Sequence, residues 1–367
     1  MTLSPCCKRS QKTFSGEAVQ GDLQEPVATA AETEVVPTIT TVARLANVSV
    51  ASASRVLNGI RTNPATLARV TEAAESVGYV PNAAARSLRS RRTGQIAFAM
   101  PDVGNPVYTT MVSSIQEVAR VRGVRLLLHS TGADLEDELA MVRDLKHRHV
   151  DGLILASLHL TEAHASELAR AAAPVVVIGR PTGDTPVDTV RAHSRKGAAE
   201  AVRHLCGAGR SRIAFVNGPT HTAPGSSRRL GYLDGLRSCG LSRDERLIEV
   251  ATDFMVEPGR AATARLLERE RPDAIFCAND LLAIGALAAL REAGLDVPRD
   301  VALVGMDNSV LAEVVWPALT SVDLGSSERA RIAAELLLSR IDEPAREAQV
   351  VGVQPRLVVR ASSGATA

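Results

Sequence analysis

From Gln95 onward, short apolar runs alternate with longer amphipathic segments, and no other feature of the sequence constrains the fold as strongly. Strands buried on both faces of a parallel sheet are continuous apolar runs, and the connecting helices repeat their apolar residues with helical spacing. The alternation therefore predicts a parallel α/β body. Roughly 270 residues is large for one sheet, so we expect two doubly wound parallel-sheet subdomains with a ligand cleft between them.

The expected elements of this body follow directly from the pattern. Strands are predicted at residues 96–100, 124–128, 153–156, 175–178, 213–216, 274–277 and 301–304. Helices are predicted at residues 111–122, 135–147, 196–205, 228–238, 259–269, 281–293 and 329–340.

Ahead of the body, three short helical patterns are predicted at residues 39–46, 50–57 and 64–77. Thr38, Ser49 and Asn63 are suitable N-caps, and Pro64 occupies a first helical position. Two short helices joined by a tight turn fit a helix-turn-helix, whose second helix presents its first turn to base edges in DNA. That turn holds Val50, Ala51 and Ser52. A generic three-helix bundle is the alternative interpretation.

The distribution of charge supports a DNA partner for this head. Residues 37–92 contain eight arginines and two glutamates, whereas the whole chain is nearly neutral, with 42 basic and 41 acidic residues. A small basic module beside a mildly acidic body suggests a polyanion partner. Arg55 is the expected fork for a base or phosphate, and Thr38, Ser49 and Ser52 carry hydroxyl groups suited to phosphate contacts.

Several functional classes are disfavoured by what the sequence lacks. No apolar stretch is long enough for a membrane span, and residues 1–36 have no apolar secretory core, so we expect a cytoplasmic protein with no membrane partner. Residues 1–36 have the composition of a disordered tail or of an over-extended gene start. The five cysteines form no C-x-x-C pair, and we expect no metal, no cofactor and no catalytic set.

The stretches TITTVARLANVSVASASRVLNG (38–59) and VGYVPNAAARSL (77–88) resemble the DNA-binding head and hinge entry of the lactose-repressor/galactose-repressor family of bacterial transcription regulators. The resemblance implies that Val50 and Ala51 read bases and that Arg55 contacts the operator. It places Thr38, Ser49, Ser52 and Asn58 at phosphate contacts. It also implies a hinge helix at residues 84–90, whose Leu88 wedges into the minor groove; the alternative is that Leu88 packs on the head as a linker residue.

Three departures from the family pattern fall in the head. Thr41 stands where an acidic residue is usual, which predicts a weakened capping box for the first helix. Ala53 replaces a usual Val in the core. The loop between Asn58 and Pro64 is one residue short.

The resemblance continues through the body, which is similar to the periplasmic-binding-protein fold that the family uses to sense effectors. The motifs that carry it are PDVGNPVY (101–108), VDGLILA (150–156), RRLGY (228–232), PDAIFCANDLLAIGAL (272–287), VPRDVALVGMDN (297–308) and PALTSVDL (317–324). The first motif begins after the first strand, and the segment 317–324 is expected to cross back between the lobes. Asp151-Gly152 is expected to be a strand-entry turn.

The effector site is implied residue by residue. Arg228, Asn279 and Asp307 match positions that hold effector hydroxyl groups, and Phe254 matches a position that stacks on the ligand. Asp102, Asn105 and Tyr108 are expected to line the other lobe.

Alternatives remain at four of these positions. Asp307 and Asn279 are also suited to cap helices, Arg229 is a second candidate for the arginine fork, and Phe254 is suited to the core. His193 stands where an acidic residue is usual, and Val107 replaces a usual aromatic residue, which disfavours a planar purine. A carbohydrate is therefore the expected ligand.

We expect an all-α helix-turn-helix head and a two-lobed α/β body of periplasmic-binding-protein type. The expected divisions are a tail (1–36), a head (37–82), a hinge helix and linker (83–94), an N-terminal subdomain (95–192 and 323–353) and a C-terminal subdomain (193–322 and 354–367). The expected function is that of a homodimeric transcription regulator, expected to act as a repressor, that binds a palindromic operator in double-stranded DNA under control of a small effector. A solute-binding protein without a DNA-reading role is the alternative.

Overall fold

The computed structural model describes residues 37–60, 62–80, 92–181, 183 and 185–364. Two compact units divide the chain, residues 1–81 and residues 82–367, and each is described by itself. The predicted tail, the predicted hinge helix at 84–90 and Leu88 lie outside the described residues. No helix among the described residues is long and apolar enough to cross a membrane.

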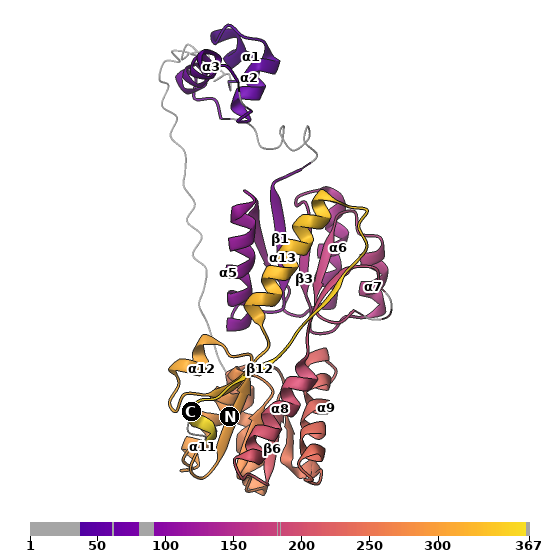
Figure 1. Ribbon diagram of the computed structural model, residues 1–367, viewed down its shortest axis with the longest axis vertical. Helices are drawn as coiled ribbons and strands as arrows, with labels where there is room; N and C mark the ends of the chain where they lie inside the picture. Colours follow the sequence, from indigo (N-terminus) through magenta and orange to yellow (C-terminus); the bar gives the residue numbers. More distant parts are fainter. Residues whose placement is uncertain (1–36, 61, 81–91, 182, 184, 365–367) are drawn as a thin grey trace, which may run out of the picture. The chain divides into compact units, whose positions relative to one another are not determined.

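The described part of the first unit is a three-helix head (Figure 1). Its helices are α1 (Ile39–Leu45), α2 (Val50–Leu57) and α3 (Pro64–Ser76). Small apolar side chains from all three helices form the core, among them Val42, Ala53 and Val70. The side chains of Thr38, Ser49 and Asn63 cap the three helices, as predicted.

The capping box predicted to be weakened at Thr41 is present in both directions. Thr41 donates its N–H to Thr38 Oγ1 at 3.3 Å, and Thr38 donates its N–H to Thr41 Oγ1 at 3.4 Å. A hydroxyl group thus replaces the usual carboxylate as the acceptor, without its negative charge at the helix N-terminus.

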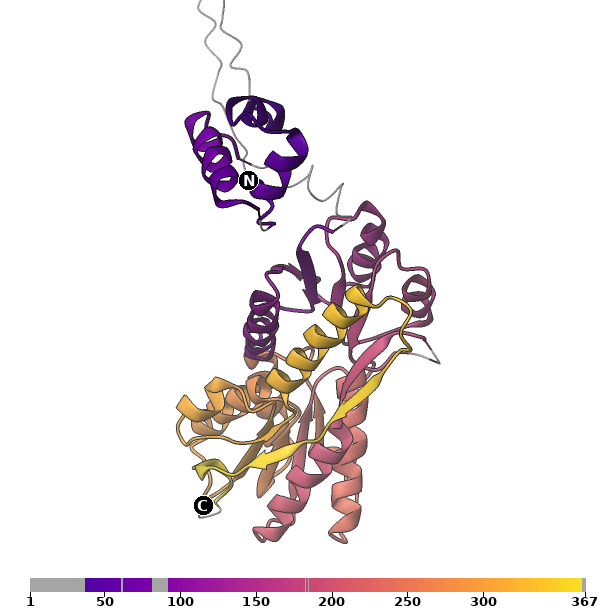
Figure 2. The ribbon, with the colours of Figure 1, turned by 45° about the horizontal axis from the view of Figure 1, so that its top comes forward.

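The second unit contains two six-stranded sheets, one in each lobe (Figures 1 and 2). The first sheet is wholly parallel, with the order β11-β5-β4-β3-β1-β2. Its strands are β1 (Gln95–Met100), β2 (Arg125–Ser130), β3 (Leu153–Ala156), β4 (Val175–Ile178), β5 (Asp188–Ala192) and β11 (Val350–Val353). Its helices are α5 (Pro106–Val121), α6 (Leu135–Asp144), α7 (Glu162–Ala169) and α13 (Ser326–Asp342), with a 3₁₀ turn at Leu145–His147.

The second sheet has the order β12-β10-β9-β8-β6-β7 and is parallel except for β12, which pairs antiparallel with β10. Its strands are β6 (Ile213–Asn217), β7 (Ile248–Val250), β8 (Ala274–Cys277), β9 (Ala302–Met306), β10 (Thr320–Asp323) and β12 (Arg356–Val358). Its helices are α8 (Ser194–Gly207), α9 (Ala223–Ser238), α10 (Val256–Arg269), α11 (Asp280–Glu292) and α12 (Val310–Val314), with 3₁₀ turns at Glu245–Leu247 and Ala361–Ser363. The predicted two-lobed α/β body is confirmed.

The chain passes between the two lobes three times, after β5, after β10 and after β11. The crossing expected within residues 317–324 begins with β10, which still belongs to the second sheet, and the chain re-enters the first lobe in α13. Figure 2 shows the yellow C-terminal segment running from one lobe to the other as β11 and β12.

The beginning of the first lobe is anchored at two points. Asp151 accepts hydrogen bonds from the N–H groups of Thr93 and Gly94, so the predicted strand-entry turn holds the segment that leads into β1. Arg92 pairs with Asp342 at 2.9 Å and donates to the carbonyl oxygen of Ile341 at 3.0 Å. The end of α13 therefore holds the residue that follows residues 81–91.

Candidate nucleic-acid interface and ligand cavity

Helix α2 has a buried face and an exposed face. Ala53 and Val56 are buried in the head, whereas Val50, Ala51 and Arg55 are exposed. The predicted base-reading residues therefore lie together on one accessible helix surface, two small apolar groups beside one guanidinium. This surface is compatible with contact to thymine methyl groups and to base or phosphate acceptors.

The predicted phosphate-contacting residues are placed less uniformly. Ser49 Oγ accepts the N–H of Ser52 at 3.1 Å and lies 2.9 Å from its hydroxyl group, so both side chains serve the cap of α2 at its exposed end. Thr38 is exposed at the start of α1. Asn58 differs, because its Nδ2 donates to the carbonyl oxygen of Ser54 at 2.7 Å. Its amide donor is therefore engaged at the end of α2.

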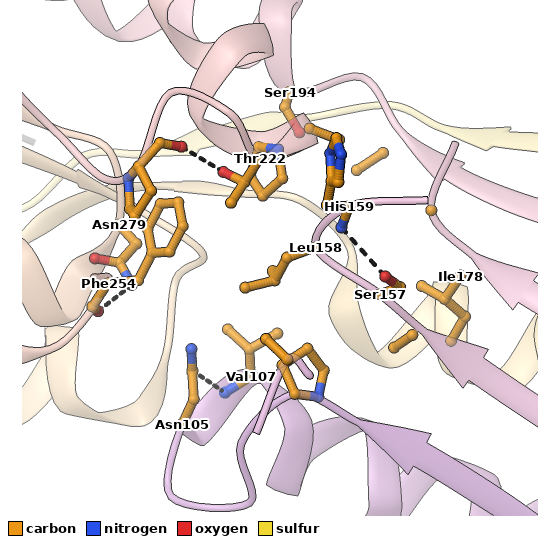
Figure 3. A pocket seen from close by; sticks show the side chains of 18 of the residues that line it. Asn105, Val107, Ser157, Leu158, His159, Ile178, Ser194, Thr222, Phe254 and Asn279 are labelled. Atoms are coloured by element: carbon orange, nitrogen blue, oxygen red, sulfur yellow. Dashed lines mark hydrogen bonds between the residues drawn. The ribbon is translucent and has the colours of Figure 1, made fainter. Parts of the chain in front are cut away.

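A cavity of about 1040 Å³ lies between the two lobes of the body (Figure 3). All seven predicted effector-contacting residues line it, together with side chains that the sequence did not single out. Asp102, Asn105 and Tyr108 come from the first lobe; Arg228, Phe254, Asn279 and Asp307 come from the second.

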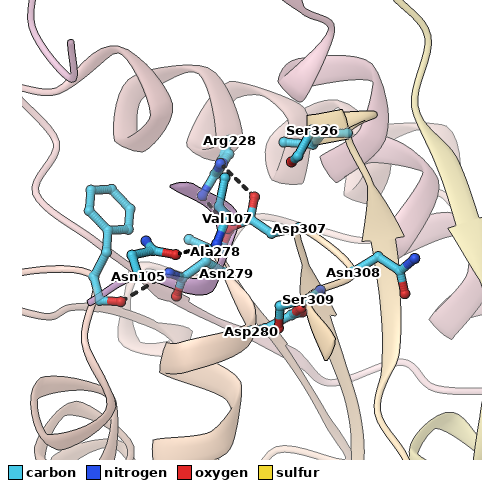
Figure 4. A network of polar contacts seen from close by, with 12 residues as sticks. Asn105, Val107, Arg228, Ala278, Asn279, Asp280, Asp307, Asn308, Ser309 and Ser326 are labelled. Atoms are coloured by element: carbon cyan, nitrogen blue, oxygen red, sulfur yellow. Dashed lines mark hydrogen bonds and ion pairs between the residues drawn. The ribbon is translucent and has the colours of Figure 1, made fainter. Parts of the chain in front are cut away.

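Arg228 and Asp307 form a buried ion pair in the wall of this cavity (Figure 4). Arg228 Nη2 lies 3.3 Å from Asp307 Oδ1, and the two side chains are only 9% and 8% exposed. Arg228 Nη1 donates to the carbonyl oxygen of Ala278 at 2.7 Å, while its buried Nε has no protein partner. Burial raises the pKa of Asp307, and the positive charge of Arg228 opposes that rise.

The alternatives at these positions have structural answers. Arg229 pairs with Glu245 and does not line the cavity. Asn279 caps α11, since its Oδ1 accepts the N–H of Leu282 at 2.9 Å, and its Nδ2 also donates to the carbonyl oxygen of Phe254 at 2.9 Å. Asp307 caps no helix and has a φ of 108°. The half-buried Phe254 packs against the core and also faces the cavity, 5.8 Å from the Arg228 guanidinium.

In the first lobe, the side chains of Asp102 and Asn105 accept hydrogen bonds from backbone N–H groups of the segment that follows β1. Asp102 Oδ1 accepts the N–H of Gly104 at 2.8 Å, and Asn105 caps α5 through the N–H of Val107 at 3.1 Å.

Burial and the negative charge of Asp307 both raise the pKa of Tyr108, so its hydroxyl group remains protonated at neutral pH.

Several charged cavity residues were not predicted from the sequence, among them Arg329 and Glu138. Arg329 of α13 is buried and donates to the carbonyl oxygen of Leu324 at 3.1 Å. Burial lowers the pKa of Arg329, and the charge of Asp307 opposes that effect. Glu138 pairs with the buried His164 at 2.9 Å. Sequence periodicity gives no warning of either, because both lie in helices rich in other charged residues.

The buried carboxyl group of Asp280 belongs to the same polar network as Arg228 and Asp307 (Figure 4). Asp280 accepts the N–H of Ser309 at 2.6 Å and the hydroxyl group of Ser321 at 2.5 Å. Burial, followed by the negative charge of Asp307, raises the pKa of Asp280 to about 7.

The lobes touch across the cavity. Ala223, at the start of α9, donates its N–H to the carbonyl oxygen of Leu158 in the first lobe at 2.8 Å. The rings of His159 and His221 approach edge to face, with centroids 6.3 Å apart. Within the described part of the chain, no three His, Cys, Asp or Glu residues are grouped to hold a metal ion.

Comparison with known proteins gives matches along nearly the whole chain. The model of bacterial regulatory proteins of the lacI family matches residues 38–82, and the model of the periplasmic binding protein-like domain matches residues 202–363. The transcriptional regulator DegA of Bacillus subtilis is 35% identical over 336 residues, which cover 89% of this chain and 98% of DegA. The regulator CelR of Thermobifida fusca is 36% identical over 335 residues, with coverage of 89% and 98%.

Among solved structures, that of the transcriptional regulator CelR–cellobiose complex matches with a TM-score of 0.68 and 34% identity. The match covers 89% of this chain and 99% of that one. Both the head and the two-lobed body are therefore shared with these proteins.

Proposed function

The chain belongs to the lacI family of bacterial regulatory proteins, and on that premise we propose that it is a cytoplasmic, homodimeric repressor whose affinity for a palindromic operator is controlled by a sugar-like effector. The observation that carries the proposal is the presence of both parts in one chain: an exposed α2 surface suited to DNA and an interlobe cavity with a buried Arg228–Asp307 pair. A solute-binding protein has no use for such a head.

For DNA reading, we propose the roles given by the resemblance. Val50 and Ala51 contact base edges and Arg55 contacts the operator, while Leu88 wedges into the minor groove. Thr38, Ser49, Ser52 and Asn58 contact phosphates. Because Asn58 Nδ2 donates to both the carbonyl oxygen and the hydroxyl group of Ser54 in the free protein, a phosphate contact through this nitrogen competes with those two bonds.

For the effector, we propose a carbohydrate held by Arg228, Asn279 and Asp307, with Phe254 stacked on the ring and Asp102, Asn105 and Tyr108 on the opposite lobe. A guanidinium beside a carboxylate offers donors and acceptors in pairs, which suits adjacent sugar hydroxyl groups. The related CelR structure is a complex with cellobiose, which supports the same ligand class here.

We also propose the divisions predicted from the sequence: tail 1–36, head 37–82, hinge helix and linker 83–94, and the two subdomains 95–192 with 323–353 and 193–322 with 354–367. A short head reads too few base pairs alone, so two heads on a two-fold axis are required for specificity. Exposed apolar side chains at α12, Val310, Val314 and Trp316, are a suitable surface for the second copy.

The test is selection of bound duplexes from a random DNA pool, repeated at two salt concentrations. We expect a palindrome of about 14–20 base pairs, which corresponds to two adjoining half-sites. Binding that is independent of sequence and steeply dependent on salt would contradict the proposal, because it would show contact with the phosphate backbone alone.

A further inference from the structure

A second cavity of about 520 Å³ opens beside the effector cavity, and four of its ten lining residues are arginine or lysine. We refer to it as the basic recess. Its lining residues are Arg180, Ala192, His193, Ser194, Arg195, Lys196, Ala199, Arg203, Ser227 and Asp234.

The positive charge of the basic recess is not balanced from within. Asp234, its one carboxylate, is already engaged by Arg195 at 2.6 Å and by Arg237 at 3.1 Å. Lys196 Nζ donates to the neutral Gln354 amide at 2.9 Å. Among the described residues, neither Arg180 nor Arg203 takes part in an ion pair.

Like charges gathered around one concavity repel one another, and a bound anion relieves that repulsion. A concave surface lined by one sign of charge also concentrates counter-ions. The planar guanidinium fork matches the oxygen spacing of phosphate and carboxylate, and lysine is a common phosphate partner. The hydroxyl groups of Ser194 and Ser227 add neutral donors on the same wall. The chemistry of the recess therefore suits a small oxyanion.

The recess is continuous with the effector cavity. Arg180, Ala192, His193, Ser194 and Ser227 line both. Arg191, on the adjoining end of β5, lines the effector cavity with a buried Nε that has no protein partner. A ligand seated between the lobes can thus extend an anionic group into the recess without leaving the protein.

We propose that the basic recess is an oxyanion subsite, which binds a phosphate or carboxylate group next to the effector. The placement of this subsite next to an effector rests on the proposed function of the main cavity. The argument from the charge of the basic recess is independent of that function. The anion is either part of the effector or a free ion, and the two sources are separable by experiment.

Isothermal titration of the full-length protein with inorganic phosphate, at constant ionic strength set by chloride, tests the subsite. The variant Lys196→Gln/Arg203→Gln removes two exposed recess cations, and Arg299→Gln/Arg331→Gln removes two exposed cations elsewhere. We expect wild type and the second variant to bind phosphate alike, and the recess variant to bind at least tenfold more weakly. No phosphate binding by the wild type, or equal binding by all three proteins, would overturn the proposal.

Displacement of phosphate identifies the source of the anion. A hexose 6-phosphate or a hexuronate that displaces phosphate at tenfold lower concentration, where neutral hexoses do not, assigns the anion to the effector. If none of them competes better than phosphate itself, the ligand of the recess is the free ion. Phosphate binding requires no operator, so failure of operator selection would contradict the proposed function while leaving this result intact.

Discussion

Arg228 and Asp307 form one buried ion pair that contributes to the stability of the body and also lines the proposed effector site. Both charges are withdrawn from water. Arg228 is stabilised by Asp307 and by the carbonyl oxygen of Ala278, and Asp307 is stabilised first by Arg228 and then by Arg329. Removing one partner of a buried pair leaves the second uncompensated, which costs more than the pair contributes.

We therefore expect Arg228→Met to lower the free energy of unfolding by about 3–5 kcal/mol at pH 7, because Asp307 would remain buried and charged or take up a proton. The neighbouring change Arg229→Met removes only a 3.4 Å pair with the exposed Glu245 and should cost less than about 0.5 kcal/mol. Urea denaturation of both variants measures the difference. Equal losses would show that the Arg228–Asp307 pair has no special energetic role.

Asp280 links stability to pH. Its pKa is about 7 in the folded protein and near 3.8 in an unfolded chain, so the folded state binds more protons between these values. The free energy of unfolding must then fall as pH rises from about 4 to about 7. Asp280→Asn mimics the protonated carboxyl group, with an oxygen for the Ser309 N–H and a donor for the Ser321 hydroxyl group.

We expect the stability of Asp280→Asn relative to wild type to increase between pH 4 and pH 7 and to level off above about pH 8. The shift of about three pKa units sets an upper bound of about 4 kcal/mol on the increase. Thermal or urea unfolding across this pH range measures it, with the exposed Asp296→Asn as control. A difference that is constant with pH would exclude the raised pKa.

At the residue scale, the sequence was most informative where a motif fixed a position. The seven predicted effector residues converge on one cavity because six of them follow a strand or begin a helix at the carboxyl edge of a sheet, and Arg228 lies in the second turn of α9. Arg329 and Glu138 were not predicted, because helical spacing cannot distinguish a charged side chain that faces a buried cavity from one that faces water. The Asn58–Ser54 bond is a similar case.

At the scale of elements, pairs of helices pack closely through glycine. A Cβ at Gly285 of α11 would lie 2.1 Å from the carbonyl oxygen of Val256 in α10. A Cβ at Gly231 of α9 would lie 2.2 Å from the carbonyl oxygen of Arg195 in α8. Backbone atoms cannot move aside as a flexible side chain does, so these glycines set the distance between paired helices.

We expect Gly285→Ala to destabilise the body by about 1–3 kcal/mol through overpacking against α10. Gly207→Ala, at the end of α8, meets no atom within 4 Å and should be neutral or stabilising by up to about 1 kcal/mol. Urea midpoints of the two variants provide the measurement. A neutral Gly285→Ala would show that α10 and α11 can separate without cost.

The strands that could be predicted from the sequence are those with continuous apolar runs, such as β3 and β8. Strand β5 was missed because its sequence, DTVRA, contains two charged residues, and Asp188 is buried only because Arg340 and Arg346 pair with it. Helices α5 and α9 begin earlier than predicted, although Asn105 and Thr222 followed closely by proline are N-terminal signals. Helix α7 and strands β7, β10, β11 and β12 are too short or too polar for periodicity to reveal.

At the scale of the whole molecule, the proposed homodimer needs a surface on which two copies can pack, and exposed apolar side chains offer one candidate. Val314 and Trp316, at and beyond the end of α12, are 71% and 81% exposed. Exposed apolar groups clustered in this way favour burial against a partner.

We expect Val314→Asp to weaken self-association at least tenfold in sedimentation experiments and to reduce operator affinity with it, because a charge would be desolvated in the interface. Val350→Asp places the same charge on the exposed edge strand β11 and should leave the dimer intact. A dimer unaffected by Val314→Asp would locate the interface elsewhere.

Helix α13 joins two distant places in the body. Its first turn holds Arg329 in the effector cavity, and its last turn holds Arg92, just beyond residues 81–91, through Asp342. At 1.5 Å per residue, about 20 Å of helix separates Arg329 from Asp342, so a tilt of only about 6° displaces the far end by roughly 2 Å. The helix is a lever arm: a ligand that rotates its cavity end by a few degrees moves the anchorage of the linker by more than half a hydrogen-bond length.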